Sequence, residues 1–575
     1  MQKRYLKDIG RLEIAGNSVN LAGNAFNIDV GIEFAYIYMR QQVRKRKGRF
    51  IMSKVITADQ AAALIQDGAT VAATGFGLAA WAEEVAQAIE KRFVETGHPR
   101  NITLTHASAI GDWKERGTTR LGKEGLVKRW IGAHIGSSAG MSKLLAENKI
   151  EAYCLPQGVI VQLFREIAAK RPGLITKVGL GTFVDPRVDG AKMNSATTED
   201  IVKVVEFEGE EWLFYKTFPI NVAIIRGTTV DENGNLTMEK EGVLMEALPL
   251  AQATKNSGGI VIVQAEYLAK AGSLHPKQVK VPGILVDHIV VATKQESCWQ
   301  TEGLYFSPAF AGDIKVPLNS IPELPMDERK IIARRAAMEL TPNTIVNLGV
   351  GIPSDVAAIA AEENLTELLT LTTEAGGIGG VPASLPHFGQ SYNGEAVVEH
   401  HSQFDYYDGG GIDAAFLGLA QTDKDGNVNV SKFKGRPMGC GGFINITQSS
   451  KKVVYCGSFT AGGLEVTARD GKLVIVKEGK NKKFIDMVEQ ITFSGKYAQK
   501  VGQPVVYVTE RAVFTLVNGQ MTLIEIAPGI DLEKDVLALM DFKPVISPAL
   551  KTMDSGIFEP KWGQLRQLVE AKTKG

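Results

Sequence analysis

Residues 343–351 read NTIVNLGVG, and residues 69–77 read ATVAATGFG. In each, a short apolar run ends in Gly-x-Gly, and a segment with helical spacing comes before it, at 327–340 and at 57–67. A strand that ends in a glycine turn before a helix is typical of open α/β sheets. The two copies predict that one α/β unit occurs twice in the chain.

Three further pairs of segments repeat in the same order in the two halves. Each contains an apolar run typical of a buried strand, and both copies of one pair end in Asp-x-x-Gly-Asn, a turn sequence. The pairs are 101–112 with 368–380, 221–235 with 413–427, and 258–264 with 451–457. One short match is expected by chance, but four in order predict two related, open α/β domains with mostly parallel sheets.

A proline-rich segment separates the two halves. Residues 301–325 contain four prolines, which is typical of a connection between domains. We therefore predict an N-terminal domain over 52–300, a linker over 301–325 and a C-terminal domain over 326–575.

The first 51 residues differ in charge from the rest of the chain. They hold ten basic and four acidic residues, a net charge of +6, whereas the chain as a whole is neutral. This predicts a basic, disordered extension over residues 1–51. Met52 looks like the natural start, because Thr57 and Gln60 then form a capping box for the first helix.

The composition is that of a globular protein, with 44% hydrophobic and 22% charged residues. The balance of 64 basic and 64 acidic residues predicts neither nucleic acid nor a membrane as partner. No apolar run approaches the ~20 residues that span a bilayer. The four cysteines form no Cys-x-x-Cys, which favours reduced thiols and a cytoplasmic location.

Glu374 is the strongest candidate for chemistry. It follows an apolar strand-like run, and four glycines come within the next six residues. Ligands of open α/β sheets bind at the carboxyl ends of the strands, where glycines let a substrate approach backbone N–H groups. The matching position in the first half is His106, so the duplication alone does not demand an acid here. The alternative is a surface glutamate in a flexible loop.

The glycine loops at 75–77 and 349–351 allow two interpretations. They are either tight turns between strand and helix, or cradles whose N–H groups face a phosphate or carbonyl oxygen. Neither continues as a phosphate-binding Gly-Lys-Ser/Thr sequence. His400 and His401 resemble a metal-binding pair, but neighbours on a strand point to opposite faces, so we predict no metal site.

Nine segments together resemble one family. They are GLVKRWIGAHIG (125–136), NKIEAYCLPQG (148–158), GTFVDPR (181–187), LGVGIP (348–353), TLTTEAGGIGGVPA (370–383), QFDYYDGGG (403–411), GCGGFINIT (439–447), ITFSGK (491–496) and IEIAPGIDL (524–532). From Met52 to about Phe558, the chain resembles class I coenzyme A-transferases whose two halves are fused. It is most similar to the bacterial propionate/acetate CoA-transferase group, and also to succinyl-CoA:3-ketoacid CoA-transferases.

The resemblance implies an active site between the two α/β domains, with Glu374 as the nucleophile. Residues implied to meet the acyl group or its oxyanion are Gly75, Phe76, Gly77, Gln157, Gly376 and Gly377. Residues implied to bind CoA are Gly349, Val350, Gly351, Ile352, Pro353, Gly441 and Gly442.

The reaction implied is transfer of CoA between a short-chain acyl-CoA and a free short-chain carboxylate through a glutamyl-CoA thioester. Acetate, propionate, lactate, butyrate and acetoacetate are all acids of this kind. CoA is then a substrate, no cofactor is permanently bound, and a homo-oligomer, dimer or tetramer, is expected. Two alternatives stay open: an acyl-CoA hydrolase on the same fold, and a non-catalytic protein that senses CoA or a sugar phosphate.

Overall fold

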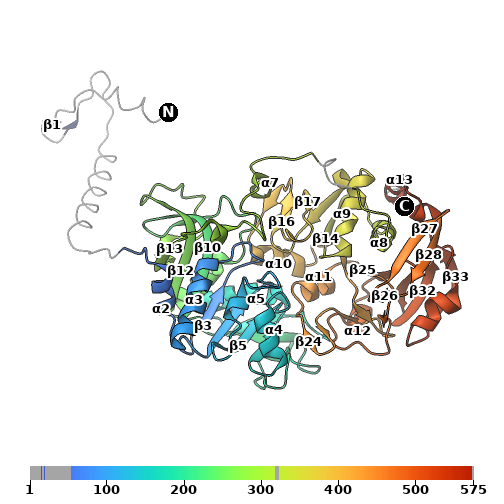
Figure 1. Ribbon diagram of the computed structural model, residues 1–575, viewed down its shortest axis with the longest axis horizontal. Helices are drawn as coiled ribbons and strands as arrows, with labels where there is room; N and C mark the ends of the chain where they lie inside the picture. Colours follow the sequence, from blue (N-terminus) through green and yellow to red (C-terminus); the bar gives the residue numbers. More distant parts are fainter. Residues whose placement is uncertain (1–13, 16–17, 20–52, 318–322, 573–575) are drawn as a thin grey trace. The chain divides into compact units, whose positions relative to one another are not determined.

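The computed structural model describes residues 14–15, 18–19, 53–317 and 323–572 (Figure 1). The chain divides into two units, Met1–Ser53 and Lys54–Gly575. In the first, β1 (Ile14–Ala15) pairs antiparallel with β2 (Ser18–Val19). The rest of the predicted extension over residues 1–51, together with Met52, lies outside the described residues, so the disorder and the start site stay predictions.

The N-terminal half contains a sheet with the strand order β13-β12-β10-β3-β4-β5-β6. All neighbours along this order are parallel, and β11 (Leu236–Thr237) adds an antiparallel partner to β10. The strands are β3 (Thr70–Ala73), β4 (Ile102–His106), β5 (Val127–Gly132), β6 (Glu151–Cys154), β10 (Val222–Asp231), β12 (Ile260–Ala269) and β13 (His288–Val291). Their continuous apolar runs are buried, as expected of a parallel sheet covered on both faces.

The C-terminal half contains a second sheet with the order β19-β16-β15-β14-β20-β25-β30-β31-β32-β33. Its centre, from β15 to β30, is parallel, while antiparallel pairs flank it on both sides. The strands are β14 (Thr344–Leu348), β15 (Leu369–Thr372), β16 (Gly377–Ile378), β19 (Ala396–Val397), β20 (Ala414–Gly418), β25 (Val453–Cys456), β30 (Val505–Val508), β31 (Ala512–Val517), β32 (Gln520–Ile526) and β33 (Val545–Thr552).

The four repeated segments form matching strands in the two sheets. In the first half they are β4, β3, β10 and β12, which are neighbours in that order. In the second they are β15, β14, β20 and β25, again neighbours in that order and again parallel. The predicted duplication and the α/β class with mostly parallel sheets are therefore confirmed.

Helices connect and cover the strands. The helices of the two halves include α2 (Ala58–Ala63), α3 (Glu83–Thr96), α5 (Gln157–Ala168), α6 (Ala247–Asn256), α8 (Glu328–Ala337), α9 (Ile352–Glu362), α10 (His400–Asp408) and α11 (Phe443–Ser449). The predicted capping box is confirmed, because Thr57 and Gln60 exchange side-chain and backbone hydrogen bonds at the start of α2. Helix α6 packs on β10 and β12, and α9 packs on β14 and β20.

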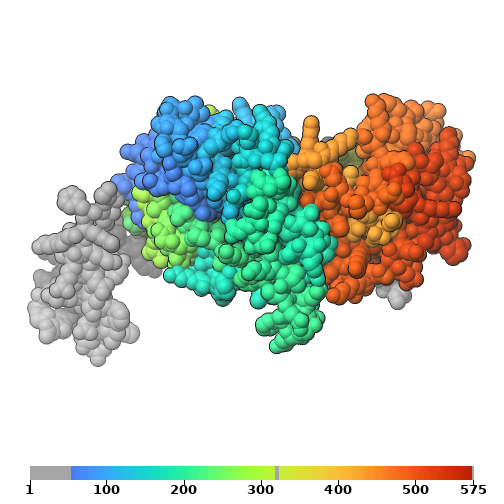
Figure 2. Space-filling model, turned by 90° about the horizontal axis from the view of Figure 1, so that it is seen from below, coloured from blue at the N-terminus to red at the C-terminus, as the bar shows by residue number. Residues whose placement is uncertain are grey.

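The two halves meet along helices α5, α10 and α11, which contact one another. The Gln162 amide donates to Asp408 at 2.9 Å, and the Gly158 N–H donates to the Asn445 side chain at 3.1 Å. One hydrophobic core runs through both halves. Figure 2 shows the green surface of the first half directly against the orange surface of the second. The limits at 300 and 326 stay our proposal for the domain boundaries.

The predicted linker contains one described helical turn, α7 (Pro308–Ala311). Among the described residues, no helix combines the length and the apolar character needed to cross a membrane.

Candidate active site

Glu374 lies in the loop directly after β15, at the carboxyl edge of the parallel strands of the second sheet. The residue is half-buried, and its exposed part lines a cavity. Removal of the carboxylate from water raises its pKa to about 7, while the charge of His400 and a hydrogen bond from the Gly442 N–H act in the opposite direction. With a pKa near 7, this carboxylate is partly protonated at neutral pH, and it is poorly solvated.

Gly442 faces Glu374 across the cavity, immediately before α11. Its backbone N–H donates to the Glu374 carboxylate. A Cβ atom at this position would lie 2.0 Å from Glu374 Oε2, so a side chain is excluded by contact. The backbone of Gly442 has an ordinary helical conformation (φ −80°), so glycine is required here by the approach of Glu374 and not by the backbone angles.

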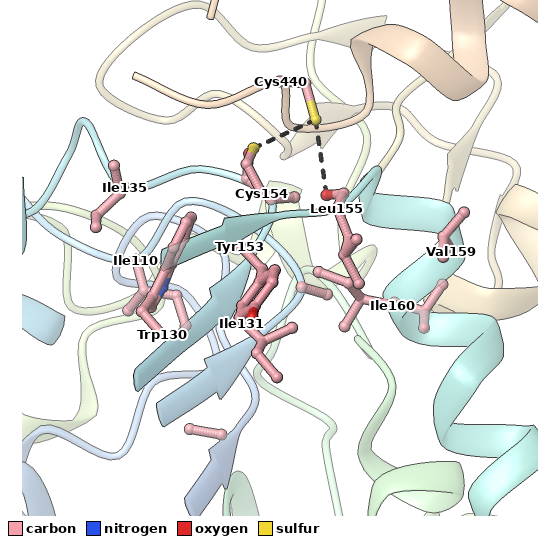
Figure 3. Close-up of a cluster of buried hydrophobic side chains, with 14 of the residues drawn as sticks. Ile110, Trp130, Ile131, Ile135, Tyr153, Cys154, Leu155, Val159, Ile160 and Cys440 are labelled. Carbon is pink, nitrogen blue, oxygen red and sulfur yellow. Dashed lines mark hydrogen bonds between the residues drawn. The ribbon is translucent and has the colours of Figure 1, made fainter. Parts of the chain in front are cut away.

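The segment that carries Gly442 belongs to the C-terminal half but is attached to the N-terminal half. Figure 3 shows Cys440 above the end of β6, with its Sγ 3.7 Å from the Sγ of Cys154 and 3.6 Å from the Leu155 carbonyl oxygen. The Gly441 N–H donates to the Ala133 carbonyl at 2.8 Å, and the Gly441 carbonyl accepts from the Gln157 N–H at 3.0 Å. All four cysteines are free thiols.

The cavity beside Glu374 has a volume of about 210 Å³. It is lined by His134, Asn347, Leu348, Gly349, Val350, Glu374, Phe388, Leu417, Gly418, Val430, Gly439, Cys440, Gly441, Gly442, Phe443 and Ile446. Glycines and apolar side chains dominate this wall, which suits a thin, partly apolar ligand.

Some of the predicted CoA-binding residues line the same cavity as Glu374, and the others do not. Gly349, Val350, Gly441 and Gly442 line the cavity. Gly351, with a positive φ of 87°, precedes α9, and the two residues after it form the first turn of that helix. Ile352 and Pro353 are not cavity-lining residues, so their predicted contact with CoA stays a prediction.

The glycines after Glu374 have their N–H groups engaged within the loop. Gly376 N–H donates to the Thr373 carbonyl at 3.1 Å, and Gly377 N–H donates to Thr373 Oγ1 at 3.0 Å. In this structure they are therefore not free to bind an oxyanion, and the role predicted for them stays a prediction. The Gly442 N–H is the donor that meets the carboxylate.

The loop at 75–77 of the first half reaches the site through an aromatic contact. Phe76 packs on Phe388, with ring centroids 5.9 Å apart, and Phe388 lines the cavity. Phe76 also packs with Ala375, the residue after Glu374. The loop is closed by its own hydrogen bonds, from Phe76 N–H to the Ala79 carbonyl and from Gly77 N–H to the Ala109 carbonyl.

Gln157 lies at the start of α5 and touches a group that sequence reasoning missed. Its amide Nε2 is 2.9 Å from Nε2 of His400, and Nδ1 of His400 is 2.6 Å from Oε2 of Glu246. All three side chains are at most 1% exposed. The expectation that His400 and His401 lie on a strand was wrong, because both are in the first turn of α10.

Glu246 escaped detection because it is 154 residues from His400 in sequence and approaches it only through the fold. The residue that could have pointed to this pair is His400, because it is ionisable and lies in a segment that packs against the glycine loops. Among the described residues, no group of three His, Cys, Asp or Glu side chains is arranged to hold a metal ion.

A larger cavity, of about 1070 Å³, lies elsewhere and shares no lining residue with the cavity at Glu374. Its wall includes Asp185 and Arg187, which form an ion pair at 2.8 Å, and the Arg187 N–H donates to the Asp185 side chain. The Arg187 guanidinium is held by Asp185 and Glu211. The charge of Arg187 is thus paired within the protein, and Glu374 lines the smaller cavity, where we place the candidate chemistry.

The chain is similar to several known proteins. Residues 55–292 match the family model described as coenzyme A transferase. Caffeate CoA-transferase of Acetobacterium woodii is 63% identical over 519 residues, which cover 89% of this chain and 99% of the relative. Acetate CoA-transferase YdiF of Escherichia coli K12 is 44% identical over 505 residues, 88% of this chain and 95% of the relative.

A crystal structure of acyl-CoA transferase YdiF from E. coli O157:H7, in a thioester complex with CoA, superposes with a TM-score of 0.84 at 43% identity. The match covers 89% of this chain and 97% of that one. With a relative of 63% identity along almost its whole length, the chain belongs to the coenzyme A transferase family and is related to the succinyl-CoA:3-ketoacid CoA-transferases.

Proposed function

We propose that this enzyme transfers CoA between an acyl-CoA and a free carboxylate, with Glu374 as the nucleophile. The observation that supports this most is the meeting of a poorly solvated carboxylate with the Gly442 N–H at the wall of a cavity. The YdiF crystal structure, which is described as a thioester complex with CoA, also supports a covalent mechanism in this family.

The proposed reaction requires no general base. Attack of a Glu374 oxygen on the thioester carbonyl carbon breaks the C–S bond, releases the CoA thiolate and leaves a mixed anhydride. The thiolate then attacks the Glu374 carbonyl carbon, which frees the donor acid and forms a glutamyl-CoA thioester. An acceptor carboxylate repeats these steps in reverse. Every attacking group is already an anion, so no proton has to be removed.

Two features of the site suit this sequence of steps. The Gly442 N–H points at the Glu374 carboxylate, where an oxyanion would develop when the thiolate adds to or leaves Glu374. The narrow, largely apolar cavity limits access of water, which would otherwise hydrolyse the anhydride. Gly349 and Val350 lie on the wall at which we place the CoA chain, and binding energy from remote parts of CoA is then available for the transition state.

We propose short-chain carboxylates as the acids, namely acetate, propionate, lactate, butyrate or acetoacetate. The relative named acetate CoA-transferase supports this class at 44% identity. A second candidate class is the hydroxycinnamic acids, because the relative named caffeate CoA-transferase is 63% identical. A competition assay that offers acetyl-CoA with C2–C6 acids and with caffeate in one mixture separates the two classes by the acyl-CoA products.

The covalent step is tested by trapping. Purified enzyme mixed with acetyl-CoA and then with borohydride or hydroxylamine should become modified at Glu374, as read by peptide mass mapping. Transfer conserves total thioester and needs an acceptor acid, whereas a hydrolase loses thioester without one. An enzyme that is never modified at Glu374, or that loses thioester at the same rate with and without acceptor, would contradict the proposal.

We also propose that the enzyme is a cytoplasmic homo-oligomer. The four free cysteines suit a reducing compartment. Sedimentation analysis of the purified protein tests the oligomeric state.

A further inference from the structure

A buried chain of three polar side chains leads from α6 through α10 to the cavity wall. Glu246 directly precedes α6, His400 begins α10, and Gln157 begins α5. The imidazole of His400 contacts Glu246 through Nδ1 (2.6 Å) and Gln157 through Nε2 (2.9 Å). Three different elements therefore fix one imidazole ring, which is completely buried.

Burial of these polar side chains costs folding free energy, which points to a role for them in the site. Glu246 is completely buried, its Oε2 contacts His400, and its Oε1 has no hydrogen-bond partner among the described residues. A buried carboxylate with one partner is stable only beside a compensating positive charge. The 2.6 Å contact is therefore a hydrogen bond in which the Nδ1–H of His400 donates to Oε2 of Glu246.

Two groups of the active site lie within reach of His400. The first is Glu374, whose pKa the positive charge of His400 lowers against the effect of burial. The second is Gln157, whose carboxamide contacts His400 on one side. Its other side faces Gly441, since a Cβ there would lie 3.8 Å from Gln157 Oε1, and Gly441 lines the cavity.

The carboxamide has two orientations, and His400 selects between them. If Nε2 of His400 lacks a proton, the Gln157 NH2 group donates to it and Oε1 faces the cavity side. If both ring nitrogens carry protons, Oε1 must accept from Nε2–H, and the NH2 group turns towards the cavity as a hydrogen-bond donor. A donor is the group that a developing oxyanion or an acid substrate needs.

We propose that Glu246 and His400 are positioning residues for the transfer reaction: Glu246 holds the proton on His400, and His400 orients the Gln157 carboxamide and favours the anionic form of Glu374. This rests on the proposed function of Glu374 and adds to it two residues from outside the cavity. Two further titratable groups that interact with the charge of Glu374, Cys440 and Tyr407, do not compete for this role. Burial raises the pKa of the Cys440 thiol and of the Tyr407 phenol, so both stay neutral near pH 7.

The test compares three variants by steady-state kinetics over pH, with acetyl-CoA as donor and propionate or caffeate as acceptor. His400→Gln should lower kcat about 100-fold, the effect of a misplaced catalytic group, with KM for acetyl-CoA nearly unchanged. It should also move the acid limb of the kcat/KM profile to higher pH, because Glu374 loses its neighbouring charge. Glu246→Gln should act in the same direction with a smaller effect.

His401→Gln is the matched control. His401 is the next residue of α10 and lies 3.4 Å from Glu399, so its replacement should leave both kcat and the acid limb as in wild type. Thermal unfolding checks that each variant folds. If His400→Gln does not fold, Glu246→Gln carries the test alone.

Trapping at Glu374 distinguishes failure of this proposal from failure of the proposed function. If wild-type enzyme is not modified at Glu374 by acetyl-CoA and borohydride, the nucleophile itself is wrong. If wild type is modified, but folded His400→Gln and Glu246→Gln variants are modified as fast and keep the wild-type acid limb, the positioning role alone is overturned. Slower modification with a shifted acid limb supports it.

Discussion

The matching strands β4 and β15 lead to His106 and Glu374, two residues with different surroundings. In the first half His106 is 1% exposed, its Nδ1 contacts the Ser108 carbonyl at 2.7 Å, and its Nε2 accepts from Trp130 Nε1 at 2.9 Å. Burial lowers the pKa of His106 to about 4, so the ring is neutral. In the second half Glu374 opens onto a cavity and meets a backbone donor from another loop.

The difference shows how a duplicated fold supports a single reaction centre. Both copies place a polar residue at the carboxyl edge of the sheet, but one copy satisfies it inside the core and the other leaves it facing a ligand space. The first half then contributes by contact: Phe76 packs on Phe388, and Gln157 reaches His400. One half supports the site, and the other supplies the reacting group.

The largest effect is expected when the reacting group is removed. Glu374→Ala should reduce CoA transfer to less than about 1% of wild type, because the covalent intermediate cannot form. Glu374→Asp should also be poor, since the shorter side chain withdraws the carboxylate. Analysis of the acyl-CoA products formed with an acceptor acid measures the loss.

Glu367→Ala is the control for this first change. Glu367 lies in the same half, on the surface, in an ion pair with Arg566. It should keep wild-type transfer. A folded Glu374→Ala enzyme with more than a few per cent of wild-type activity would show that Glu374 is not the nucleophile.

The second prediction concerns Gly442, whose N–H donates to the Glu374 carboxylate. Gly442→Ala should lower kcat by about 100- to 1,000-fold, the range for loss of one oxyanion donor, because the new Cβ displaces Glu374. Gly394→Ala in the same half is the control, since its Cβ would meet no atom closer than 3.8 Å. Equal activity of the two variants would mean that the contact between Gly442 and Glu374 has no role.

The third prediction uses pH. Because the pKa of Glu374 is raised to about 7, kcat/KM should fall as the pH drops below 7 and the carboxylate is protonated. A raised pKa also means that the folded state binds this proton more tightly, so stability is lost as the pH rises from the unfolded value towards 7. Glu374→Gln should therefore be more stable than wild type at pH 8, by up to about 3 kcal/mol, and nearly equal to it at pH 5.

Thermal or denaturant unfolding of both proteins at the two pH values measures this difference. A stability gain that is the same at pH 5 and pH 8 would rule out ionisation of Glu374 as its cause.

The smallest effect on activity is expected at His106, the buried residue at the end of β4. His106→Leu leaves the buried Trp130 N–H without its acceptor, which should cost about 1–3 kcal/mol in the free energy of unfolding. Transfer by the folded protein should stay within about twofold of wild type. His98→Leu, at a half-exposed surface position, should change neither quantity. A large loss of turnover in His106→Leu without loss of stability would give the first half a chemical role of its own.

The repeated strands could be predicted from sequence because buried parallel strands are continuous apolar runs that end in recognisable glycine turns. Glu374 could be selected because an isolated acid in a glycine-rich strand end has few structural uses. The contact with Gly442 could not, since 68 residues separate it from Glu374 and only the fold brings the two together. The strand assigned to His400 was wrong because a short polar segment with aromatic residues has no clear period, and its partner Glu246 comes from the other half.

The attachment of residues 438–441 to the first half makes the geometry at Glu374 depend on the contact between the two halves. Met438 accepts hydrogen bonds from Ile135 and Gly136, and Gly441 exchanges them with Ala133 and Gln157. Because these bonds tie the strip to the first half, the position of the Gly442 N–H beside Glu374 depends on how the two halves pack against each other.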